Sequence, residues 1–412
     1  MLDVDPETVA LEDIDVSQPQ LFAEDRVEPL FARLRRDAPV HYCRDSAFGP
    51  YWSITRFEDI QYVDTHHDLF SSDGEITIDN EDSEEDYELP MFIAMDPPVH
   101  DDQRKVVAPV VAPANLKVLA DTIRERAAGI LDSLPVGETF NWVERVSIVL
   151  TGQMLATLFD MPIEDRLKLS RWSDVGSHGV KGGVIAGVIK DAAEYQSELD
   201  GCLAYFTRLW NERIAQPPGN DLISMLAHGE STRHMTPQEF LGNLILLIVG
   251  GNDTTRNSIS GGVLALNRNP AEYDKLRTDR SLISNMVSEI IRYQTPLAHM
   301  RRTATADTEL AGKRIREGDT VVMWYLSGNR DDTAIERAAE FLIDRAKARH
   351  HLSFGFGIHR CMGNRLAEMQ LRILWEEIMA RFAFVEVVGE PVRLPSNFIH
   401  GFTDLPVRVH PL

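Results

Sequence analysis

One cysteine of this sequence lies in a setting that suits a metal-bound thiolate. Cys361 belongs to the run Phe354-Gly355-Phe356-Gly357-Ile358-His359-Arg360-Cys361-Met362-Gly363. Glycines on both sides of the cysteine favour a tight loop whose backbone can approach a flat ligand. Helical periodicity follows, so we expect the cysteine at a helix N-terminus, where the dipole and free N–H groups stabilise a thiolate. A thiolate in an apolar loop suits iron, and thiolate ligation favours cleavage of an O–O bond.

An acid and an alcohol stand side by side in a helix that should be deeply buried. The segment 241–259 predicts a long helix, and its apolar run 244–249 leaves no polar face. The helix continues into Gly250-Gly251-Asn252-Asp253-Thr254-Thr255, although a helical glycine costs about 1 kcal/mol and a buried unpaired carboxylate costs more. Asp253 and Thr254 could deliver protons to a bound oxidant. The structural alternative is a helix kink with a back-bonded threonine.

Other charged residues stand at helical spacings. Glu289 and Arg292 are three residues apart on one predicted helix face, and His100 and Arg104 are four apart. Taken singly, such residues are usually exposed and contribute little to stability. These spacings alone therefore do not assign a function.

Composition limits the partners and the compartment. The 412 residues carry 42 Lys+Arg against 64 Asp+Glu, and the net charge of −22 argues against nucleic acid as the main partner. The three cysteines are odd in number and far apart, so we expect no disulfide framework and interpret Cys43 and Cys202 as buried hydrophobes. We expect neither a signal peptide nor a membrane span, because the N-terminus is acidic and no apolar run approaches about 18 residues. The expectation is a soluble, cytoplasmic protein.

Helical patterns outnumber strand patterns, which predicts a mainly α fold with small β-sheets and a single domain over 1–412. Strand-like segments place the β-rich parts at about 38–80 and 296–326. Helices are predicted at 26–36, over most of 115–215, at 241–259 and onward to 292, and at 362–382.

Two segments are predicted to be loops. The acidic stretch 79–88 is expected to be solvated. The glycine-rich stretch 176–187 is expected to be a mobile apolar connection between helices. It could be an ordinary interhelical loop or a substrate gate.

The cysteine loop resembles the signature of the cytochrome P-450 superfamily at Phe354, Gly357, Cys361 and Gly363. The resemblance implies a haem-thiolate monooxygenase. Its haem b would lie between the long buried helix and the helix after the cysteine loop, with Cys361 as the axial iron ligand. The segment 250–254 resembles the oxygen-activation motif of the same superfamily, in which the two glycines make room for O2 and the Asp253–Thr254 pair relays protons.

The resemblance also implies roles for charged residues. Glu289 and Arg292 match the superfamily's ExxR motif, which implies a structural ion-pair network for folding and haem retention, with Arg345 as its third member. Four basic residues match positions that pair with the haem propionates: His100, Arg104, Arg302 and His359. Further contacts to the cofactor are expected from Gly250, Gly251, Phe354, Gly355 and Gly363.

Longer segments, 250–257, 294–302 and 359–365, resemble the bacterial alkane-hydroxylase branch. Its members insert oxygen at the terminal carbon of medium-chain alkanes, and some accept fatty acids or terpenes. An apolar lining suits a chain without a polar handle. Fatty-acid omega-hydroxylation and terpene or steroid hydroxylation remain alternatives, and His299 and His400 lie near the candidate lining in sequence. The residues expected to line the pocket are Met91, Phe92, Val249, Leu297, Met300, Ile399 and Phe402.

Electrons from NAD(P)H must reach the protein through a partner, because the sequence has no flavin or nicotinamide fingerprint and no ferredoxin cysteine cluster. The resemblance implies a ferredoxin, of the 2Fe–2S type, and its reductase. Candidates for a basic docking face are Arg104, Lys105, Arg360 and Arg365.

Two other functions remain open for a haem-thiolate protein. One is a haem-based sensor or carrier without catalysis, and the other is a peroxide-driven relative. Asp253 and Thr254 argue against both. A sensor needs no proton relay, and peroxide-driven enzymes typically replace that pair with other groups.

Overall fold

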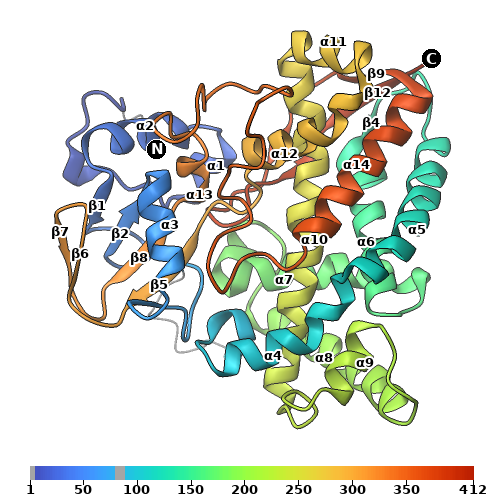
Figure 1. Cartoon of the computed structure of the whole chain (residues 1–412), viewed down its shortest axis with the longest axis horizontal. Coiled ribbons are helices and arrows are strands. Elements are labelled where there is room, and N and C mark those ends of the chain that lie inside the picture. The colour runs from blue at the N-terminus through green and yellow to red at the C-terminus, as the bar shows by residue number, and fades with distance from the viewer. Residues whose placement is uncertain (1–4, 79–88) are drawn as a thin grey trace.

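The computed structural model describes residues 5–78 and 89–412, so the predicted acidic loop at 79–88 lies outside the described residues. Helices fill one side of the molecule, and the N-terminal strands gather on the other (Figure 1). The mainly α prediction is confirmed. The α-helices are α1 (Pro19–Ala23), α2 (Val27–Asp37), α3 (Phe57–Thr65), α4 (Val99–Val107), α5 (Pro113–Asp132), α6 (Ile148–Leu158), α7 (Arg166–Ile185), α8 (Ala192–Ile214), α9 (Leu222–His228), α10 (Pro237–Arg268), α11 (Pro270–Thr278), α12 (Ile283–Gln294), α13 (Tyr325–Gly328) and α14 (Asn364–Arg381).

The largest sheet joins the two predicted β-rich parts of the chain. Its strand order is β1-β2-β8-β5-β3, and β2 runs parallel to β8 while the other neighbours are antiparallel. These strands are β1 (Val40–Cys43), β2 (Tyr51–Ile54), β3 (Phe70–Ser71), β5 (Met300–Ala304) and β8 (Thr320–Met323).

Smaller sheets complete the fold, and those formed by the C-terminal strands were not predicted. The strand orders are β4-β12-β9, β10-β11 and β6-β7. The strands are β4 (Phe140–Asn141), β6 (Thr308–Leu310), β7 (Lys313–Ile315), β9 (Phe382–Val387), β10 (Val392–Arg393), β11 (Phe402–Asp404) and β12 (Pro406–Pro411).

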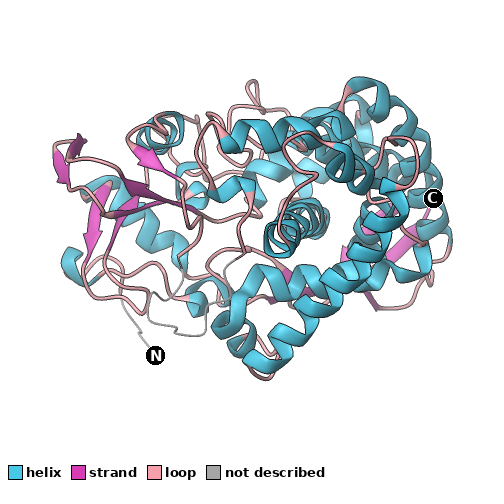
Figure 2. Cartoon of the chain, turned by 90° about the horizontal axis from the view of Figure 1, so that it is seen from below, coloured by secondary structure: helices cyan, strands magenta, loops and turns pink. Residues whose placement is uncertain are grey.

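The long helix α10 runs through the centre of the molecule, with other helices around it (Figure 2). Its start is fixed by a capping box, in which the Glu239 backbone N–H donates to the Thr236 hydroxyl and the Glu239 carboxylate accepts from the Thr236 backbone N–H. The prediction of complete burial is wrong for part of the apolar run. Leu246, Leu247 and Val249 are partly exposed because they face an internal cavity.

The segment just after the undescribed residues packs tightly against α10. A Cβ atom at Gly242 would lie 2.1 Å from the carbonyl oxygen of Pro90, so only glycine admits the backbone there. At the next residue of α10, the Phe92 backbone N–H donates to the side-chain carbonyl of Asn243, with a distance of 3.0 Å. These two contacts fix Met91 and its neighbours beside the central helix.

The glycine-rich stretch 176–187 differs from its prediction. Most of it belongs to α7, which continues to Ile185 and is broken only at Gly179, where φ is 61° and ψ is −170°. A Cβ at Gly176 would lie 2.5 Å from the Ile245 side chain, so that glycine permits close helix packing. The glycines therefore allow a break in α7 and its close packing against α10, and they do not form an open loop.

Within the part of the chain that the structure describes, no single helix is both long and apolar enough to cross a membrane. The pair Val99–Val111 and Pro113–Asp132 meets that requirement only when counted together across a bend of 48°.

Candidate active site

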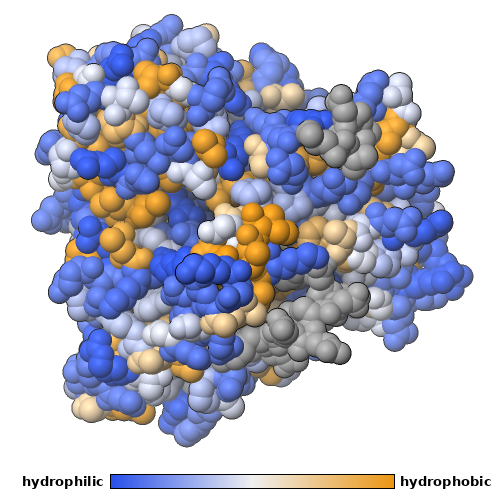
Figure 3. Space-filling model, turned by 180° about the vertical axis from the view of Figure 1, so that it is seen from behind, coloured by the Kyte–Doolittle hydropathy of each residue, from blue (hydrophilic) through white to orange (hydrophobic). Residues whose placement is uncertain are grey.

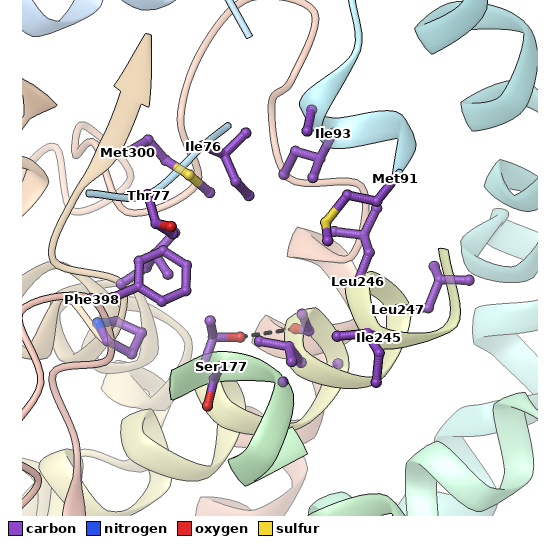
Figure 4. Close-up of a pocket in the computed structure, with 18 of the residues that line it drawn as sticks. Ile76, Thr77, Met91, Ile93, Ser177, Ile245, Leu246, Leu247, Met300 and Phe398 are labelled. Carbon is purple, nitrogen blue, oxygen red and sulfur yellow. Dashed lines mark hydrogen bonds between the residues drawn. The ribbon is translucent and has the colours of Figure 1, made fainter. Parts of the chain in front are cut away.

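A cavity of about 970 Å³ lies between α10, α7 and loops that flank the large sheet. Ile185 lines it at one end and has 58% of its surface exposed, so the cavity reaches the surface near the end of α7. Figure 3 shows apolar side chains gathered beside a hollow near the middle of one face. Figure 4 shows side chains from separate segments turned toward the interior, among them Ile76, Met91, Ile93, Leu246, Met300 and Phe398.

Cys361 faces this cavity at the opposite side from α7. Its loop closes with a 2.7 Å hydrogen bond from the Cys361 N–H to the Phe354 carbonyl, and Gly355 and Gly357 both have φ of +63°. Desolvation raises the pKa of the Cys361 thiol, while the Gly363 N–H and the nearby guanidinium of Arg104 lower it. Since α14 begins at Asn364, the predicted placement before a helix is confirmed.

The other two cysteines are buried, as predicted. Burial raises the pKa of Cys43 to about 12, and it also raises that of Cys202. Neither of these two cysteines lines the cavity, whereas Cys361 does.

Two histidines near Cys361 each have one ring nitrogen without a partner in the protein. Within the described residues, the buried His100 Nε2 and His359 Nδ1 have no hydrogen-bond partner. The two rings lie 4.3 Å apart between centroids, and the other nitrogens bind Asp101 at 2.7 Å and Ser72 at 2.8 Å. Burial lowers the pKa of His359 to about 2, so it is neutral and can donate one hydrogen bond.

Two arginines line the same part of the cavity. Arg302 on β5 is 2% exposed and bonds the Arg301 carbonyl at 2.7 Å and the Asp64 carboxylate at 3.0 Å. Arg104 on α4 donates to the Arg360 carbonyl. Both arginines and His359 line the cavity, whereas His100 lies just behind His359. The two guanidinium groups and the Nδ1–H of His359 would suit the propionates of a haem whose iron Cys361 would hold.

Asp64 belongs to this constellation, although no sequence signal identified it. Asp64 lies one residue before the end of the short helix α3, in a segment without a sequence motif. Its partners are more than 200 residues away along the chain. Its contacts also include the Tyr325 hydroxyl and the Phe356 N–H, at 3.1 and 2.6 Å. Only a structure, or covariation with those partners, could reveal it.

The Asp253–Thr254 pair spans two faces of α10. The Thr254 side chain lines the cavity and its hydroxyl donates to the Gly250 carbonyl, with a distance of 3.1 Å. Asp253 is fully buried outside the cavity and pairs with Arg256 at 2.6 Å. Arg256 in turn pairs at 2.9 Å with Asp174, whose side chain is 36% exposed. Burial raises the pKa of Asp253, and Arg256 opposes that rise.

The two glycines before this pair have different surroundings. A Cβ at Gly250 would meet nothing within 4 Å, whereas one at Gly251 would lie 2.8 Å from the Leu155 side chain. Both residues line the cavity. Gly250 thus leaves open space above Cys361, and Gly251 also allows α6 to pack against α10.

The predicted ion-pair network is present, with Glu289 and Arg292 fully buried and the Arg345 side chain 7% exposed. Glu289 binds Arg292 at 2.7 Å and Arg345 at 3.0 Å. Arg292 also donates to the Asn329 carbonyl at 2.6 Å, and the Asn329 side-chain carbonyl accepts from the Leu352 N–H at 2.7 Å. The network therefore connects through Asn329 to the residues just before the cysteine loop.

Five of the seven predicted substrate contacts line the cavity: Met91, Phe92, Val249, Leu297 and Met300. Ile399 and Phe402 do not. The residues just before Ile399, 395–398, line the cavity, while Ile399 is fully buried behind a bridge to Leu297. Phe402 packs in the main core beneath the Arg393 guanidinium, 4.7 Å from the ring centre. Lining residues that the sequence did not indicate include Ile76, Thr77, Ser177, Ile245 and Phe398.

We expect Glu289→Gln to lower the free energy of unfolding by about 3–5 kcal/mol, because it leaves two buried guanidinium groups without their carboxylate. The measurement is thermal or urea unfolding of the haem-loaded protein. Arg314→Gln is the matched control, since it breaks the exposed Arg314–Asp307 pair and should change stability by less than about 0.5 kcal/mol. Equal effects of the two substitutions would contradict a structural role for the network.

Comparisons with known proteins agree with this geometry. Residues 188–406 match the family model described as Cytochrome P450. The solved structure of cytochrome P450-153 from Novosphingobium aromaticivorans is 48% identical, with a TM-score of 0.90, over 96% of this chain and 99% of that one. Linalool 8-monooxygenase from Pseudomonas putida is 36% identical over 96% of this chain and 99% of its own length. The methyl-branched lipid omega-hydroxylase of Mycobacterium tuberculosis is 32% identical over 98% of this chain and 96% of its length. The chain belongs to the cytochrome P450 family.

Proposed function

We propose that this P450 monooxygenase hydroxylates the terminal carbon of a medium-chain n-alkane. The observation that carries the proposal is the apolar wall of the cavity above Cys361. Ile245, Leu246, Leu297, Met300 and Phe398 all contribute to that wall. An apolar chamber of this kind holds a hydrocarbon chain by burial alone, without a polar handle.

The two histidines considered for a carboxylate do not supply a binding site. His299 and His400 are buried outside the cavity lining, and burial lowers the pKa of each to about 4. His299 accepts from the Ile78 N–H at 3.1 Å and contacts the Asn397 carbonyl at 2.9 Å, so both its nitrogens are engaged. Neutral, engaged imidazoles favour an uncharged substrate over a fatty acid.

Fatty-acid omega-hydroxylation is the second candidate function, because one lysine belongs to the lining. Lys181 lies on the exposed part of α7, four residues before Ile185 at the open end of the cavity. A lysine there could hold the carboxylate of a chain whose methyl end points inward. The product distribution from mixed substrates distinguishes the two candidates.

Two relatives also support oxidation at a chain end. One acts at the omega position of methyl-branched lipids, and the other acts at position 8 of linalool. Omega denotes the far end of a chain, and carbon 8 of linalool is a terminal methyl group. We extend that positional preference to this chain.

The residues of the chain have distinct parts in the proposed reaction. One atom of O2 enters the C–H bond and the other leaves as water, which requires two electrons and two protons; the bound haem supplies this oxygen chemistry. The apolar walls exclude water and hold the methyl end near Gly250. The Thr254 hydroxyl faces the cavity, and Asp253, the residue before it, is the carboxyl group that would supply protons toward it, since burial raises its pKa. Arg256 holds Asp253 in place and connects it to the partly exposed Asp174.

Product identification tests the proposal. The haem-loaded protein is incubated with a surrogate ferredoxin, its reductase, NADH and equimolar octane, dodecanoic acid and limonene, and the products are separated by gas chromatography. We expect 1-octanol as the main product, with NADH consumed in proportion. Hydroxylated dodecanoic acid or limonene with octane untouched would refute the substrate while leaving the monooxygenase. Turnover with hydrogen peroxide but not with NADH would indicate a peroxide-driven enzyme instead.

Bulk at Leu297 should limit which carbon reaches the reaction centre. We expect Leu297→Ala to raise the ratio of 2- and 3-octanol to 1-octanol by about fivefold, since ~1 kcal/mol of positional preference corresponds to that factor. Ile399→Val is the control: Ile399 pairs with Leu297 across the bridge but does not line the cavity, so the ratio should not change. An unchanged ratio in Leu297→Ala would remove this residue from the positioning role.

We also propose that the electron donor is a ferredoxin that docks beside Cys361. Of the four residues predicted for the basic face, Lys105, Arg360 and Arg365 are exposed, whereas Arg104 is half-buried. A small acidic protein would be attracted to these three charges even though the whole chain is acidic.

Charge reversal tests this docking face. We expect Arg365→Glu to slow haem reduction by a 2Fe–2S ferredoxin several-fold at low ionic strength, with the difference shrinking near 0.5 M salt. The rate is measured by stopped-flow absorbance. Lys313→Glu, an exposed change on β7, makes the same charge difference away from the site and should leave the rate unaltered. Similar rates for both variants would place the docking site elsewhere.

A further inference from the structure

Asp64 is a buried carboxylate that the proposed reaction leaves without a role. It lies one residue before the end of α3 and is 3% exposed, although a buried charge is costly unless it is paired. Three hydrogen bonds to the Asp64 carboxylate offset that cost. Oδ1 accepts from Arg302 at 3.0 Å, and Oδ2 accepts from the Tyr325 hydroxyl at 3.1 Å and the Phe356 N–H at 2.6 Å. Three donors on two oxygens suit the ionised form.

The three donors to Asp64 belong to separate segments of the chain. Arg302 lies on β5, Tyr325 begins α13, and Phe356 belongs to the cysteine loop five residues before Cys361. Asp64 therefore connects the end of α3, the large sheet and the cysteine loop through one side chain. Such a group sets the position of the loop relative to the sheet.

The backbone packing at this point is equally close. A Cβ at Gly357 would lie 2.3 Å from the carbonyl oxygen of Asp64, and one at Gly355 would lie 3.1 Å from its Oδ2. Both glycines have φ of +63°, a conformation that other residues rarely adopt. The cysteine loop thus packs directly against Asp64. Side chains at positions 355 and 357 would clash with Asp64, so glycine is required at both.

Charge gives Asp64 a second effect. Arg302 lines the cavity on the side of Cys361, and its side chain and that of Asp64 are 3% and 1% exposed. In so dry a place an unbalanced guanidinium would act strongly on a redox centre beside it. Asp64 is the carboxylate in direct contact with Arg302. Burial raises the pKa of Asp64, and Arg302 is the largest of the contacts that lower it.

We propose that Asp64 is a positioning residue for the haem site, seating the cysteine loop and orienting Arg302 toward a propionate while offsetting its positive charge. The inference rests on haem binding, which the whole family shares, and not on the identity of the substrate. A wrong alkane assignment would therefore leave it intact.

Two readouts on haem-loaded variants separate the two effects. Asp64→Asn keeps the shape and removes the charge; we expect the midpoint potential to become more positive, because a negative charge near the iron no longer disfavours the added electron. Haem loss to excess apomyoglobin should accelerate about tenfold. Tyr325→Phe removes one hydrogen bond to the same carboxylate without changing charge, so haem loss should rise a few-fold at an unchanged potential. A merely structural role for Asp64 would move haem loss alone.

A potential and a haem-loss rate in Asp64→Asn equal to those of the unaltered protein would overturn the proposal. A shift of potential as large in Tyr325→Phe as in Asp64→Asn would overturn the charge effect. If Asp64→Asn yields no haem-loaded protein, Asp64→Glu replaces it, since it keeps the charge and displaces the carboxylate by one methylene. That variant should retain the potential and lose haem faster, and haem loss at the original rate in both Asp64→Glu and Tyr325→Phe would refute the positioning role.

Discussion

The cysteine loop has to satisfy a demanding constraint: its thiolate must face a cavity and still be stabilised by the protein. Desolvation raises the pKa of Cys361, and the opposing effects come from the N–H groups of Gly363 and Asn364 and from nearby arginines. Those donors help only while the loop keeps its shape. Left-handed glycines at 355 and 357 make the shape possible, but they do not by themselves hold it.

The loop is held from two directions by buried charge. From the helical side, the Glu289–Arg292 pair reaches it through Asn329, whose amide contacts Leu352 and the Ser353 hydroxyl. From the sheet side, Asp64 contacts Phe356 directly. Both groups are fully buried and fully bonded, so a shift of the loop would break several charge-assisted hydrogen bonds together. That cooperation explains why charged residues sit in the core near a site whose cavity is largely apolar.

The sequence was informative where a function imposes a residue pattern within a short stretch. The cysteine loop, the glycine-acid-alcohol run of α10 and the ion pair on α12 could each be predicted from a short stretch of sequence. The first two meet at one cavity, and the third connects to the cysteine loop through Asn329. Asp64 could not be predicted, because its three partners are distant in sequence. Ile399 was predicted to line the cavity, whereas residues 395–398 line it and Ile399 is buried behind Leu297, a placement that depends on the tertiary fold of an irregular segment. The glycines at 176–187 indicated a loop, whereas Gly176 allows close packing of α7 against α10.

The central helix α10 separates charged side chains from the apolar cavity. Successive helical residues point about 100° apart, so neighbours on α10 can face different environments. Asp253 faces Arg256 and the route to the surface at Asp174, while Thr254 faces the cavity. The ion pairs of Asp253 lie on a face of α10 away from the cavity, so this buried carboxylate does not interrupt the apolar wall. The adjacency of an acid and an alcohol in the sequence therefore places a charged group and a cavity-facing hydroxyl on different faces of one helix.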